Sequence, residues 1–337
     1  MAAGIVWMKG KTSVLLLLVA VLIMLSGFEG CGPGGASSTQ LKAVPHETAW
    51  GIYKLDIVTQ DVTLLYSFPA GSYPSDLRLD NTGDRFVFAQ KADGSDDNTT
   101  EIYTLGVNGG DLKKLTINHY RDLYPVWSPD DKHIAFLSWR EKDLDIYVMD
   151  ADGKNEMKLY DSGNNDADID WVGDSIVFTS KSAVWVMKDD GIQAVQVTSY
   201  PEMGKWGLAN LPEGDYDPRL SPDGREISFE RLENTADPNG GYNIFKIRRD
   251  GEGEVRLTSN GYSQGLASWS HSGKELVYSV AAIDGQGKYD IYLMNADGTD
   301  NRNITPGYFP ADFLCHLPAF SPDDTAIFFL GQWWENQ

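Results

Sequence analysis

The sequence predicts an all-β fold, a six-bladed β-propeller, and three observations lead to this prediction. The first is a segment that recurs six times: an aromatic residue or leucine, a turn that often reads Ser-Pro-Asp-Gly or Ser-Pro-Asp-Asp, and a short apolar run. Self-similarity at a period of about 40 to 50 residues is typical of propellers, in which each repeat supplies one blade. The copies, roughly 44 to 51 positions apart, begin at Leu79, Trp127, Trp171, Leu220, Trp269 and Phe320.

The second observation is that a repeat contains four β-rich runs separated by turn residues. In the clearest copy these runs are 122–127, 133–137, 146–149 and 157–160. The turn at 128–131 begins Ser-Pro-Asp, in which proline sets φ and aspartate can hydrogen-bond to its own backbone. The turn at 150–153 contains Asp and Gly, which tolerate positive φ. Four strands joined by turns form one blade, and no segment after the N-terminus shows sustained helical periodicity.

The third observation is that the two ends of the chain hold complementary halves of one repeat. Residues 52–55 and 64–66 match the third and fourth runs of a blade, whereas 317–330 contains only the first and second. Pairing these ends would complete a sixth blade and leave no open sheet edge. We therefore expect the N-terminal outer strands to close the C-terminal blade.

The repeat resembles that of the TolB-like propellers. The resemblance rests on Ser128-Pro129-Asp130-Asp131 after Trp127, on Ile146-Tyr147-Val148-Met149 with Ala151-Asp152-Gly153, and on a final Leu-Thr such as Leu257-Thr258. It extends from Trp50 to Leu330, and no Trp-Asp dipeptide closes the third strand as it does in WD repeats. The protein TolB also has an α/β domain before its propeller. Here about twenty residues separate the apolar leader from the first strand, so the resemblance implies a stand-alone propeller.

The N-terminal region reads as an export signal followed by a linker. Lys9 and Lys11 precede the apolar run Val14–Leu25, which is short for a transmembrane helix and suits a signal peptide over residues 1–30. Cys31 follows and resembles the lipid-modified cysteine of bacterial lipoproteins, with ordinary cleavage as the alternative. The Gly/Ser-rich region 31–49 would be a flexible tether, and 50–337 the propeller. We expect an exported protein, periplasmic or at the cell surface, that meets the membrane only through a lipid on Cys31.

Charge limits the partners. The 337 residues include 28 Lys and Arg against 49 Asp and Glu, a net charge of −21. Nucleic-acid binding requires basic surfaces, so this composition argues against it. It is compatible with a soluble extracytoplasmic protein, a basic partner or bound cations. Cys315 is the only cysteine besides Cys31, and a lipidated Cys31 could not form a disulfide with it.

Motifs for catalysis or metal binding are weak. Gly261-Tyr262-Ser263-Gln264-Gly265 matches G-x-S-x-G, but it lies between strands and no helix follows it. The five histidines show no metal spacing. Only His119 and His316 fall on loops leading to inner strands, and TolB-like propellers include pectate-fragment lyases that use histidines and a divalent metal. We expect no catalytic residue, metal or cofactor.

The inner strands suggest a candidate site at one mouth of the central channel. The first residue of each recurring segment, from Leu79 to Phe320, is expected to end an inner strand. The residues three positions before it in the six copies are Asp76, Tyr124, Asp168, Asp217, Leu266 and Leu317. The residues five positions before it in the second, third and fourth copies are Asp122, Asp166 and Asp215. Arg78 and Arg219 lie two residues after Asp76 and Asp217, on the same side of an extended strand. Two interpretations stay open. The charges pair across blades, or they form an acidic funnel for a basic peptide, a cation or a polar ligand.

The same face carries the longest loops, including 199–216 with Trp206 and 231–242. Aromatic residues on such loops serve recognition or pack as lids. We therefore predict a monomeric, non-enzymatic binding or scaffold module for a protein or polysaccharide of the cell envelope. Its predicted binding residues are Asp76, Asp122, Asp166, Asp168, Asp215, Asp217, Arg219, Trp206, His119 and His316. The alternatives are a carbohydrate-active lyase or hydrolase that uses the acidic channel mouth, and a purely structural component of an envelope complex.

Overall fold

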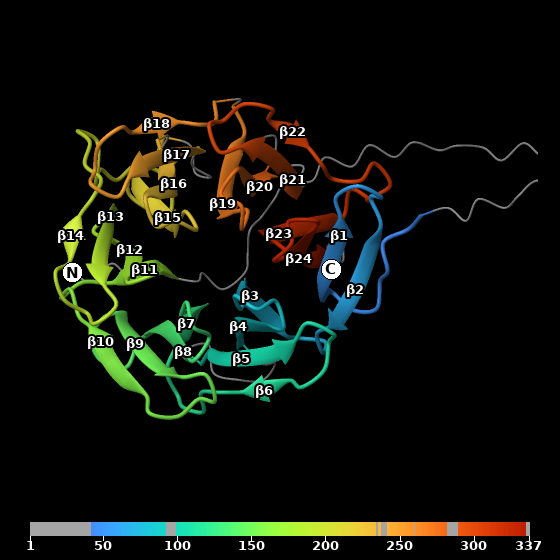
Figure 1. Cartoon of the computed structure of the whole chain (residues 1–337), viewed down its shortest axis with the longest axis horizontal. Helices are drawn as coiled ribbons and strands as arrows, with labels where there is room; N and C mark the ends of the chain where they lie inside the picture. Colours follow the sequence, from blue (N-terminus) through green and yellow to red (C-terminus); the bar gives the residue numbers. More distant parts are fainter. Residues whose placement is uncertain are drawn as a thin grey trace, which may run out of the picture. The chain divides into compact units, whose positions relative to one another are not determined.

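The computed structural model describes residues 42–91, 99–233, 235–236, 241–259, 261–281 and 289–334. These residues form 24 β-strands in six four-stranded antiparallel sheets, which surround a central axis as the blades of a propeller (Figure 1). The described residues include no helix that could cross a membrane. The predicted all-β, six-bladed propeller is confirmed. The expected signal peptide, Cys31 and most of the tether lie outside the described residues.

Each blade contributes one inner strand to the axis (Figure 1). In blades 1 to 6 the inner strands are β3 (Tyr73–Leu79), β7 (Asp122–Trp127), β11 (Asp166–Val172), β15 (Gly214–Leu220), β19 (Ser263–Trp269) and β23 (Phe313–Phe320). The second strands are β4 (Arg85–Lys91), β8 (His133–Ser138), β12 (Ser175–Ser180), β16 (Glu226–Leu232), β20 (Glu275–Ala281) and β24 (Ala326–Trp333). The third strands are β5 (Glu101–Gly106), β9 (Asp145–Asp150), β13 (Ala183–Lys188), β17 (Tyr242–Arg248), β21 (Tyr289–Asn295) and β1 (Trp50–Asp56). The outer strands are β6 (Lys113–Lys114), β10 (Met157–Tyr160), β14 (Val195–Gln196), β18 (Val255–Arg256), β22 (Arg302–Asn303) and β2 (Val62–Ser67).

Blade 6 is assembled from both ends of the described chain. Its strand order is β2-β1-β24-β23. β1 runs antiparallel to β24 in continuous register, from Trp50 opposite Gln332 to Asp56 opposite Ala326. The N-terminal strands therefore complete the last blade, as the sequence predicts, and all six blades have four strands.

The Ser-Pro-Asp turn between the first and second strands is held by its serine. Ser128 Oγ donates to Asp130 Oδ1 at 2.8 Å and accepts the backbone N–H of His133 at 2.9 Å. Ser221 and Ser321 make the same pair of contacts in blades 4 and 6. The last turn residue has positive φ in every blade, which explains why glycine recurs there: Gly83, Asp131, Gly173, Gly224, Gly273 and Asp324.

Where aspartate replaces that glycine, its carboxylate joins two blades. Asp131 accepts hydrogen bonds from the backbone N–H and the side-chain amide of Asn81, at 2.9 and 2.7 Å. Asp324 accepts the backbone N–H groups of His271 and Ser272 at 2.8 and 3.0 Å. These contacts offset the cost of positive φ for a residue with a Cβ.

The recurrent Leu-Thr pair closes the outer part of a blade. Thr116 Oγ1 accepts the backbone N–H of Ile102 at 2.9 Å, and Thr198, Thr258 and Thr305 repeat this contact in blades 3, 4 and 5. The hydroxyl takes the place of a strand partner, so an outer strand of two residues is enough. The apolar core lies between blades: one cluster packs Val87 and Ile102 of blade 1 against Trp127 and Phe136 of blade 2.

Candidate functional site

Every inner strand contains a β-bulge, and the first bulged residue has positive φ. The register between the first and second strands shifts at the same place in each blade. A non-glycine residue with positive φ is uncommon, and bulges often re-aim a side chain. We call these six residues the axial ring: Asp76 (φ 55°), Tyr124 (50°), Asp168 (52°), Asp217 (48°), Leu266 (56°) and Leu317 (53°). They are the same six residues that occupy equivalent positions when the six sequence repeats are aligned.

Carboxylates of the ring cap the bulges of neighbouring blades. Asp76 Oδ2 accepts the backbone N–H of Tyr124 at 3.4 Å, which joins blades 1 and 2. Asp168 Oδ2 accepts the backbone N–H of Asp217 at 3.2 Å, which joins blades 3 and 4. The ring aspartates thus fix the backbone around the axis as well as supplying charge.

Glu230 belongs to this site, although sequence reasoning did not single it out. It lies on the second strand β16, and its Oε2 accepts the backbone N–H of Leu266 in blade 5 at 3.3 Å. A Cβ built on Gly265 would stand 1.7 Å from that oxygen, so only glycine leaves room for the carboxylate. One sequence signal could have revealed it: an acidic residue in the second strand of one blade, together with a glycine directly before the bulge in the inner strand of the next blade.

The carboxylates around the axis raise each other's pKa. Burial, opposed by the N–H of Asp217, raises the pKa of Asp168 to about 6. Burial and the charge of Asp168 raise the pKa of Glu230 to about 8. Burial, Glu230 and Asp168 raise the pKa of Asp217 as well. When these carboxylates hold one proton between them, we expect it to reside mainly on Glu230. Arg219 donates a hydrogen bond to Asp217 and so favours the ionised form of that aspartate.

The tyrosine of the ring reports how closely these groups gather. The charge of Asp168, then burial, then the charges of Asp76 and Asp217, raise the pKa of Tyr124 well above its usual range. These side chains come from blades 1 to 4 and interact because all lie at the axis. Blades 5 and 6 contribute Leu266 and Leu317 instead. One side of the ring is therefore acidic and the other apolar.

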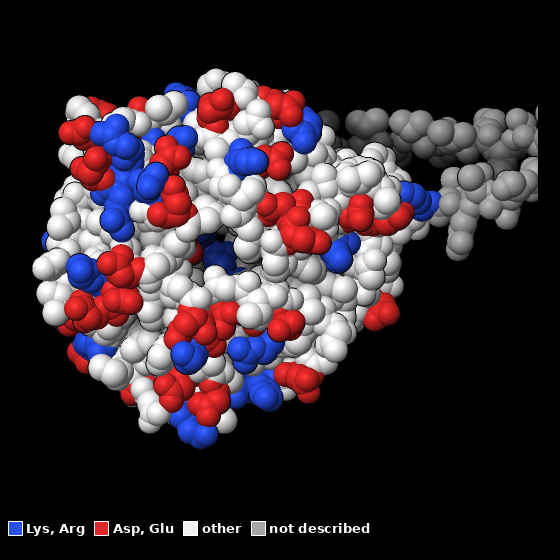
Figure 2. Space-filling view, viewed as in Figure 1, with Lys and Arg blue, Asp and Glu red and all other residues white. Residues whose placement is uncertain are grey.

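A second layer lines the axis two residues further along each inner strand. It consists of Arg78, Val126, Asp170, Arg219, Ser268 and Ala319, and these residues border a cavity of about 240 Å³. We call it the axial cavity. Figure 2 shows a hollow at the centre of the propeller with a basic side chain deep inside it. The described residues around the axis thus supply five carboxylates (Asp76, Asp168, Asp170, Asp217 and Glu230) and two guanidinium groups.

Asp122, Asp166 and Asp215 do not lie at the channel mouth where the sequence places them. All three are fully buried within their blades. The bulge that follows each one interrupts the alternation of the strand, so residues two apart no longer share a face. They are not accessible to a ligand in this structure, so the candidate site at the axis does not include them.

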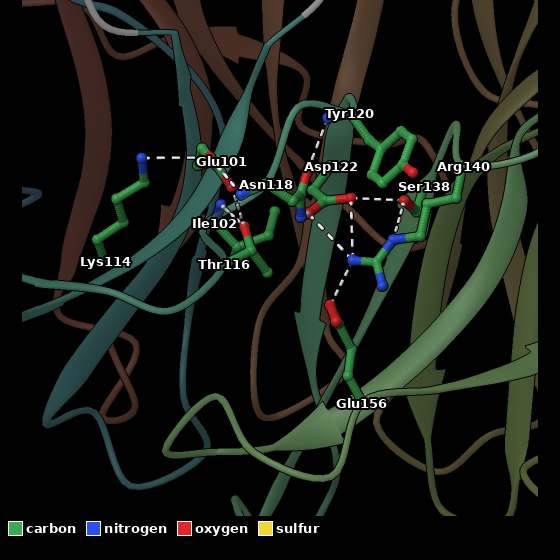
Figure 3. A network of polar contacts seen from close by, with 10 residues as sticks. All are labelled: Glu101, Ile102, Lys114, Thr116, Asn118, Tyr120, Asp122, Ser138, Arg140 and Glu156. Carbon is green, nitrogen blue, oxygen red and sulfur yellow. Dashed lines mark hydrogen bonds and ion pairs between the residues drawn. The ribbon is translucent and has the colours of Figure 1, made fainter.

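The network around Asp122 shows what such a residue does (Figure 3). Asp122 accepts hydrogen bonds from Asn118 Nδ2 at 2.7 Å and Ser138 Oγ at 2.6 Å. Arg140 Nη2 lies 3.3 Å from Asp122 Oδ2 and also pairs with Glu156 (Figure 3). The neighbouring Glu101 accepts the hydroxyl of Thr116 and the N–H of Asn118, so the loop before β7 is fastened to both blades.

Blade 4 repeats this arrangement. Arg231 Nε and Nη2 donate to the two carboxylate oxygens of Asp215 at 2.6 and 3.0 Å, and its other contacts reach Glu254 at 2.8 and 2.9 Å. The guanidinium stacks 4.2 Å from the ring of Tyr200. Tyr200 begins the long loop that carries Trp206, so the same network anchors that loop.

The loops on this face expose apolar side chains. Trp206 is 60 % exposed, so it does not pack as a lid. Six other exposed apolar residues lie on segments that enter the inner strands or leave β24, which places them on the same face of the propeller as Trp206, whereas further exposed apolar residues, such as Val58, Met157 and Val195, lie on the outer strands and their hairpins. We call Trp206 and those six residues the crown: Tyr73, Ile117, Tyr120, Trp206, Leu208, Tyr262 and Trp334.

The two candidate histidines are far from sharing a ligand. His119 is exposed on the loop before β7 in blade 2. His316, in blade 6, lies between Trp50 and Tyr289 with ring centroids 5.5 and 4.7 Å away, and burial lowers its pKa to about 4. Histidine contributes to no group of potential metal ligands in the part of the chain described.

Among the described residues, one group of potential metal ligands does come together, and it consists of three carboxylates. Glu141, Asp145 and Asp161 have oxygens close enough to share a cation. Lys158 Nζ lies 2.9, 2.8 and 3.4 Å from them and already supplies a positive charge there.

Comparison with known proteins places the fold. No family model matches the chain. A TolB homologue of Chlorobium luteolum is 26 % identical over 267 residues, which cover 66 % of this chain and 57 % of the relative. An uncharacterized peptidase, YuxL of Bacillus subtilis, is 26 % identical over 245 residues, 71 % of this chain and 34 % of the relative. The chain thus spans about a third of one relative and somewhat over half of the other.

Among solved structures, a putative TolB from Agrobacterium tumefaciens superposes with a TM-score of 0.64 at 17 % identity, covering 85 % of this chain and 99 % of that one. TolB from Acinetobacter baumannii gives 0.57 at 14 % identity, over 75 % and 62 % of the two chains. An oligogalacturonate lyase in complex with manganese gives 0.52 at 12 % identity, over 84 % and 83 %. At these identities the superpositions establish the fold. The repeat, the closure of blade 6 and these relatives agree, and the chain is a TolB-like six-bladed β-propeller.

Proposed function

We propose that this protein is an extracytoplasmic propeller lipoprotein that binds a protein partner in the cell envelope through its crown face. The observation that carries the proposal is the combination of an exposed apolar crown with an acidic half-ring on the axis behind it. The TolB-like fold is what suggests a protein-binding role in the envelope. A chain with a net charge of −21 favours a basic partner.

The geometry indicates how such a partner would be held. Exposed aromatic and aliphatic side chains such as Trp206 and Leu208 supply contact area, and Trp and Tyr are common at interaction hot spots. Asp76 and Asp168 are half-buried, so a basic side chain that enters the channel meets carboxylates in a poorly solvated place. Charge attraction there is stronger than at an open surface. Leu266 and Leu317 would contact the aliphatic part of that side chain.

The envelope location rests on the N-terminal sequence. Lys9, Lys11 and the apolar run Val14–Leu25 have the form of a signal peptide, and Cys31 follows at the position of a lipoprotein cysteine. A lipid on Cys31 would leave the propeller on a tether at the membrane surface.

Site-specific photo-crosslinking tests the crown directly. A photoreactive amino acid at Trp206 should give a discrete adduct with an envelope protein in intact cells. The matched control is Val58, which is 87 % exposed on the hairpin between β1 and β2, at the opposite face. Adducts of the same size from both positions, or none from Trp206, would reject the crown as a docking face.

The lyase alternative finds no comparable support. His119 and His316 lie in different blades, and the pKa of His316 is lowered to about 4 by burial. The likeness to the manganese-bound lyase is at 12 % identity and concerns the fold.

A further inference from the structure

Three carboxylates at the axis each keep one oxygen free. Asp76, Asp168 and Glu230 each use one oxygen to accept a backbone N–H of the next blade, at 3.4, 3.2 and 3.3 Å. The second oxygen of each, Oδ1 of the two aspartates and Oε1 of Glu230, accepts no hydrogen bond from the residues that the structure describes. All three side chains are half-buried, and these oxygens keep contact with solvent, unlike the buried Asp217 Oδ2. The channel mouth therefore presents three single acceptors, from blades 1, 3 and 4.

Asp217 shows that this site is short of positive charge. It is 6 % exposed, one of its oxygens pairs with Arg219, and the other has no hydrogen-bond partner. Native proteins rarely leave a buried carboxylate oxygen unpaired. Burial and the charges of Glu230 and Asp168 raise the pKa of Asp217, so its charge is exposed to theirs. A cation at the ring would relieve this repulsion.

The separate acceptors favour one kind of cation. Among the described residues, no three of the axial carboxylates come close enough together to share a metal ion. A guanidinium binds best through two parallel hydrogen bonds to both oxygens of one carboxylate, and here one oxygen of each is already taken. A primary ammonium has three N–H donors that point in different directions and can use oxygens from different side chains.

The wall that blades 5 and 6 contribute to the mouth is aromatic and apolar. His316 lies between Tyr289 and Trp50, with ring centroids 4.7 and 5.5 Å away, and all three side chains are half-buried. Leu266 and Leu317 complete the axial ring on this side. Lysine side chains bury their carbon stems along apolar surface while the charged end stays in a polar place. This wall therefore suits the stem of a lysine.

Two arginines limit how far a cation can enter the channel. Arg78 and Arg219 stand two residues beyond the ring along their inner strands and border the axial cavity. Like charges repel more strongly in a poorly solvated place than in open water. An ammonium group that enters from the crown therefore stops at the ring.

We propose that the channel mouth binds the ammonium group of a lysine side chain, with the free oxygens of Asp76, Asp168 and Glu230 as its acceptors. The lysine belongs to the protein partner that the crown binds, so this inference rests on the proposed function. It adds the chemical group that the channel selects, a primary ammonium in preference to a guanidinium or a metal ion.

Four capped tripeptides test this selection in calorimetric titrations of the purified protein. They are Gly-Lys-Gly, Gly-Arg-Gly and two forms of Gly-Lys-Gly in which the side-chain nitrogen is acetylated or trimethylated. The pH is 8.5, because burial and the charge of Asp168 raise the pKa of Glu230 to about 8. The lysine peptide should bind with a dissociation constant of a few millimolar or tighter. The other three should bind about tenfold more weakly or worse, because only the unmodified ammonium combines a positive charge with three divergent donors. No binding of the lysine peptide, or equal binding of the arginine or trimethylated peptide, overturns the proposal.

Variants locate the binding. Asp168→Asn keeps an oxygen that can accept the N–H of Asp217 and replaces the free oxygen by an amide NH2 group. It should weaken binding of the lysine peptide about tenfold, and so should Glu230→Gln, which makes the same change in blade 4. Glu252→Gln, on an exposed hairpin, should leave the affinity unchanged. Unchanged affinity in a folded Asp168→Asn or Glu230→Gln protein rejects the site.

The crosslinking experiment at Trp206 separates this inference from the function on which it rests. A discrete Trp206 adduct without selective lysine binding would reject the ammonium site and leave the crown as a docking face. Selective lysine binding without an adduct would keep the ammonium site and reject docking at the crown.

Discussion

The carboxylate of Asp168 accepts a hydrogen bond from the backbone N–H of Asp217, 3.2 Å away in the next blade. The contact continues around the axis, because Asp217 pairs with Arg219 and Glu230 of the same blade caps the N–H of Leu266 in blade 5. The same carboxylates thus join three blades and supply the negative charge of the channel. Substitutions of these carboxylates should therefore alter both the stability of the propeller and its binding of a basic partner. Their effect on stability can be followed through the pH dependence of unfolding.

We expect the free energy of unfolding to fall as pH rises from about 5 to about 8. Glu230, with its pKa raised to about 8, and Asp168, raised to about 6, bind more protons in the folded than in the unfolded chain over this range. Stability then decreases by up to about 1.4 kcal/mol per pH unit for each proton bound only by the folded state. The turn aspartates Asp130 and Asp323, whose pKa is lowered to about 2, titrate below this window.

Glu230→Gln should flatten that dependence and raise stability at pH 8, since it removes the charge that the ring tolerates least. Urea unfolding at pH 5.5 and pH 8 measures both effects. Glu252→Gln removes the same charge from an exposed hairpin and is the control. A pH profile for Glu230→Gln parallel to that of the parent would show that Glu230 does not hold the proton.

The closure of blade 6 can be tested with one methyl group. A Cβ on Gly331 would stand 2.4 Å from Phe313 Cζ and 2.5 Å from Tyr53 Cε2, between β23 and β1. We expect Gly331→Ala to destabilise the protein by about 1 to 3 kcal/mol, the usual cost of overpacking a core. Gly307→Ala is the control, because nothing lies within 4 Å of the added atom. Equal thermal unfolding of the two variants would contradict tight packing of the closing blade.

The buried Arg231–Asp215 pair should be costly to break. Arg231→Met leaves Asp215 and Glu254 without their cation, and removing one partner of a buried pair typically costs about 3 to 5 kcal/mol. Arg248→Met, at a surface pair, should cost at most about 1 kcal/mol. Chemical denaturation compares the two. Because Arg231 stacks on Tyr200, its loss should also make the Trp206 loop more sensitive to limited proteolysis, and an unchanged cleavage pattern would argue against that link.

Cys31→Ser should move the protein from the membrane fraction to the soluble fraction, because an attached lipid would be the hydrophobic anchor. Incorporation of labelled palmitate into the parent and not the variant would identify the modification. Cys315→Ser, a change at a buried position in β23, should leave both membrane association and labelling unaltered. If Cys31→Ser still fractionates with membranes, an uncleaved leader or a partner holds it there.

The repeat made the fold and half of the site predictable. Aligning six copies placed Asp76, Asp168 and Asp217 in equivalent positions, and those positions became the axial ring. The alignment could not show that each of them is a bulge with positive φ, because strand alternation was the only rule available. That one irregularity moved Asp122, Asp166 and Asp215 from the expected channel mouth into the blades.

Glu230 and the free oxygens at the axis were hidden for another reason. Glu230 reaches the axis from a second strand by passing over Gly265, a contact between blades that no single repeat contains. Which oxygen of Asp76 or Asp168 stays free can be recognised only once the N–H groups of the next blade have been placed. The strands and turns within one blade could be predicted from the repeat, whereas contacts between neighbouring blades could be seen only in the three-dimensional structure.

The pairing of β1 with β24 has a kinetic consequence. β1 can pair with β2 at once, but its other neighbour, β24, is the last strand of the propeller to be made, so this contact has nearly the largest sequence separation that the propeller allows. Blades 1 to 5 can each hydrogen-bond their own strands as they emerge, whereas β1 and β2 must wait with an unpaired edge. Ring closure is therefore the step most exposed to misassembly, and a factor that shields β1 during folding would raise the yield of native protein.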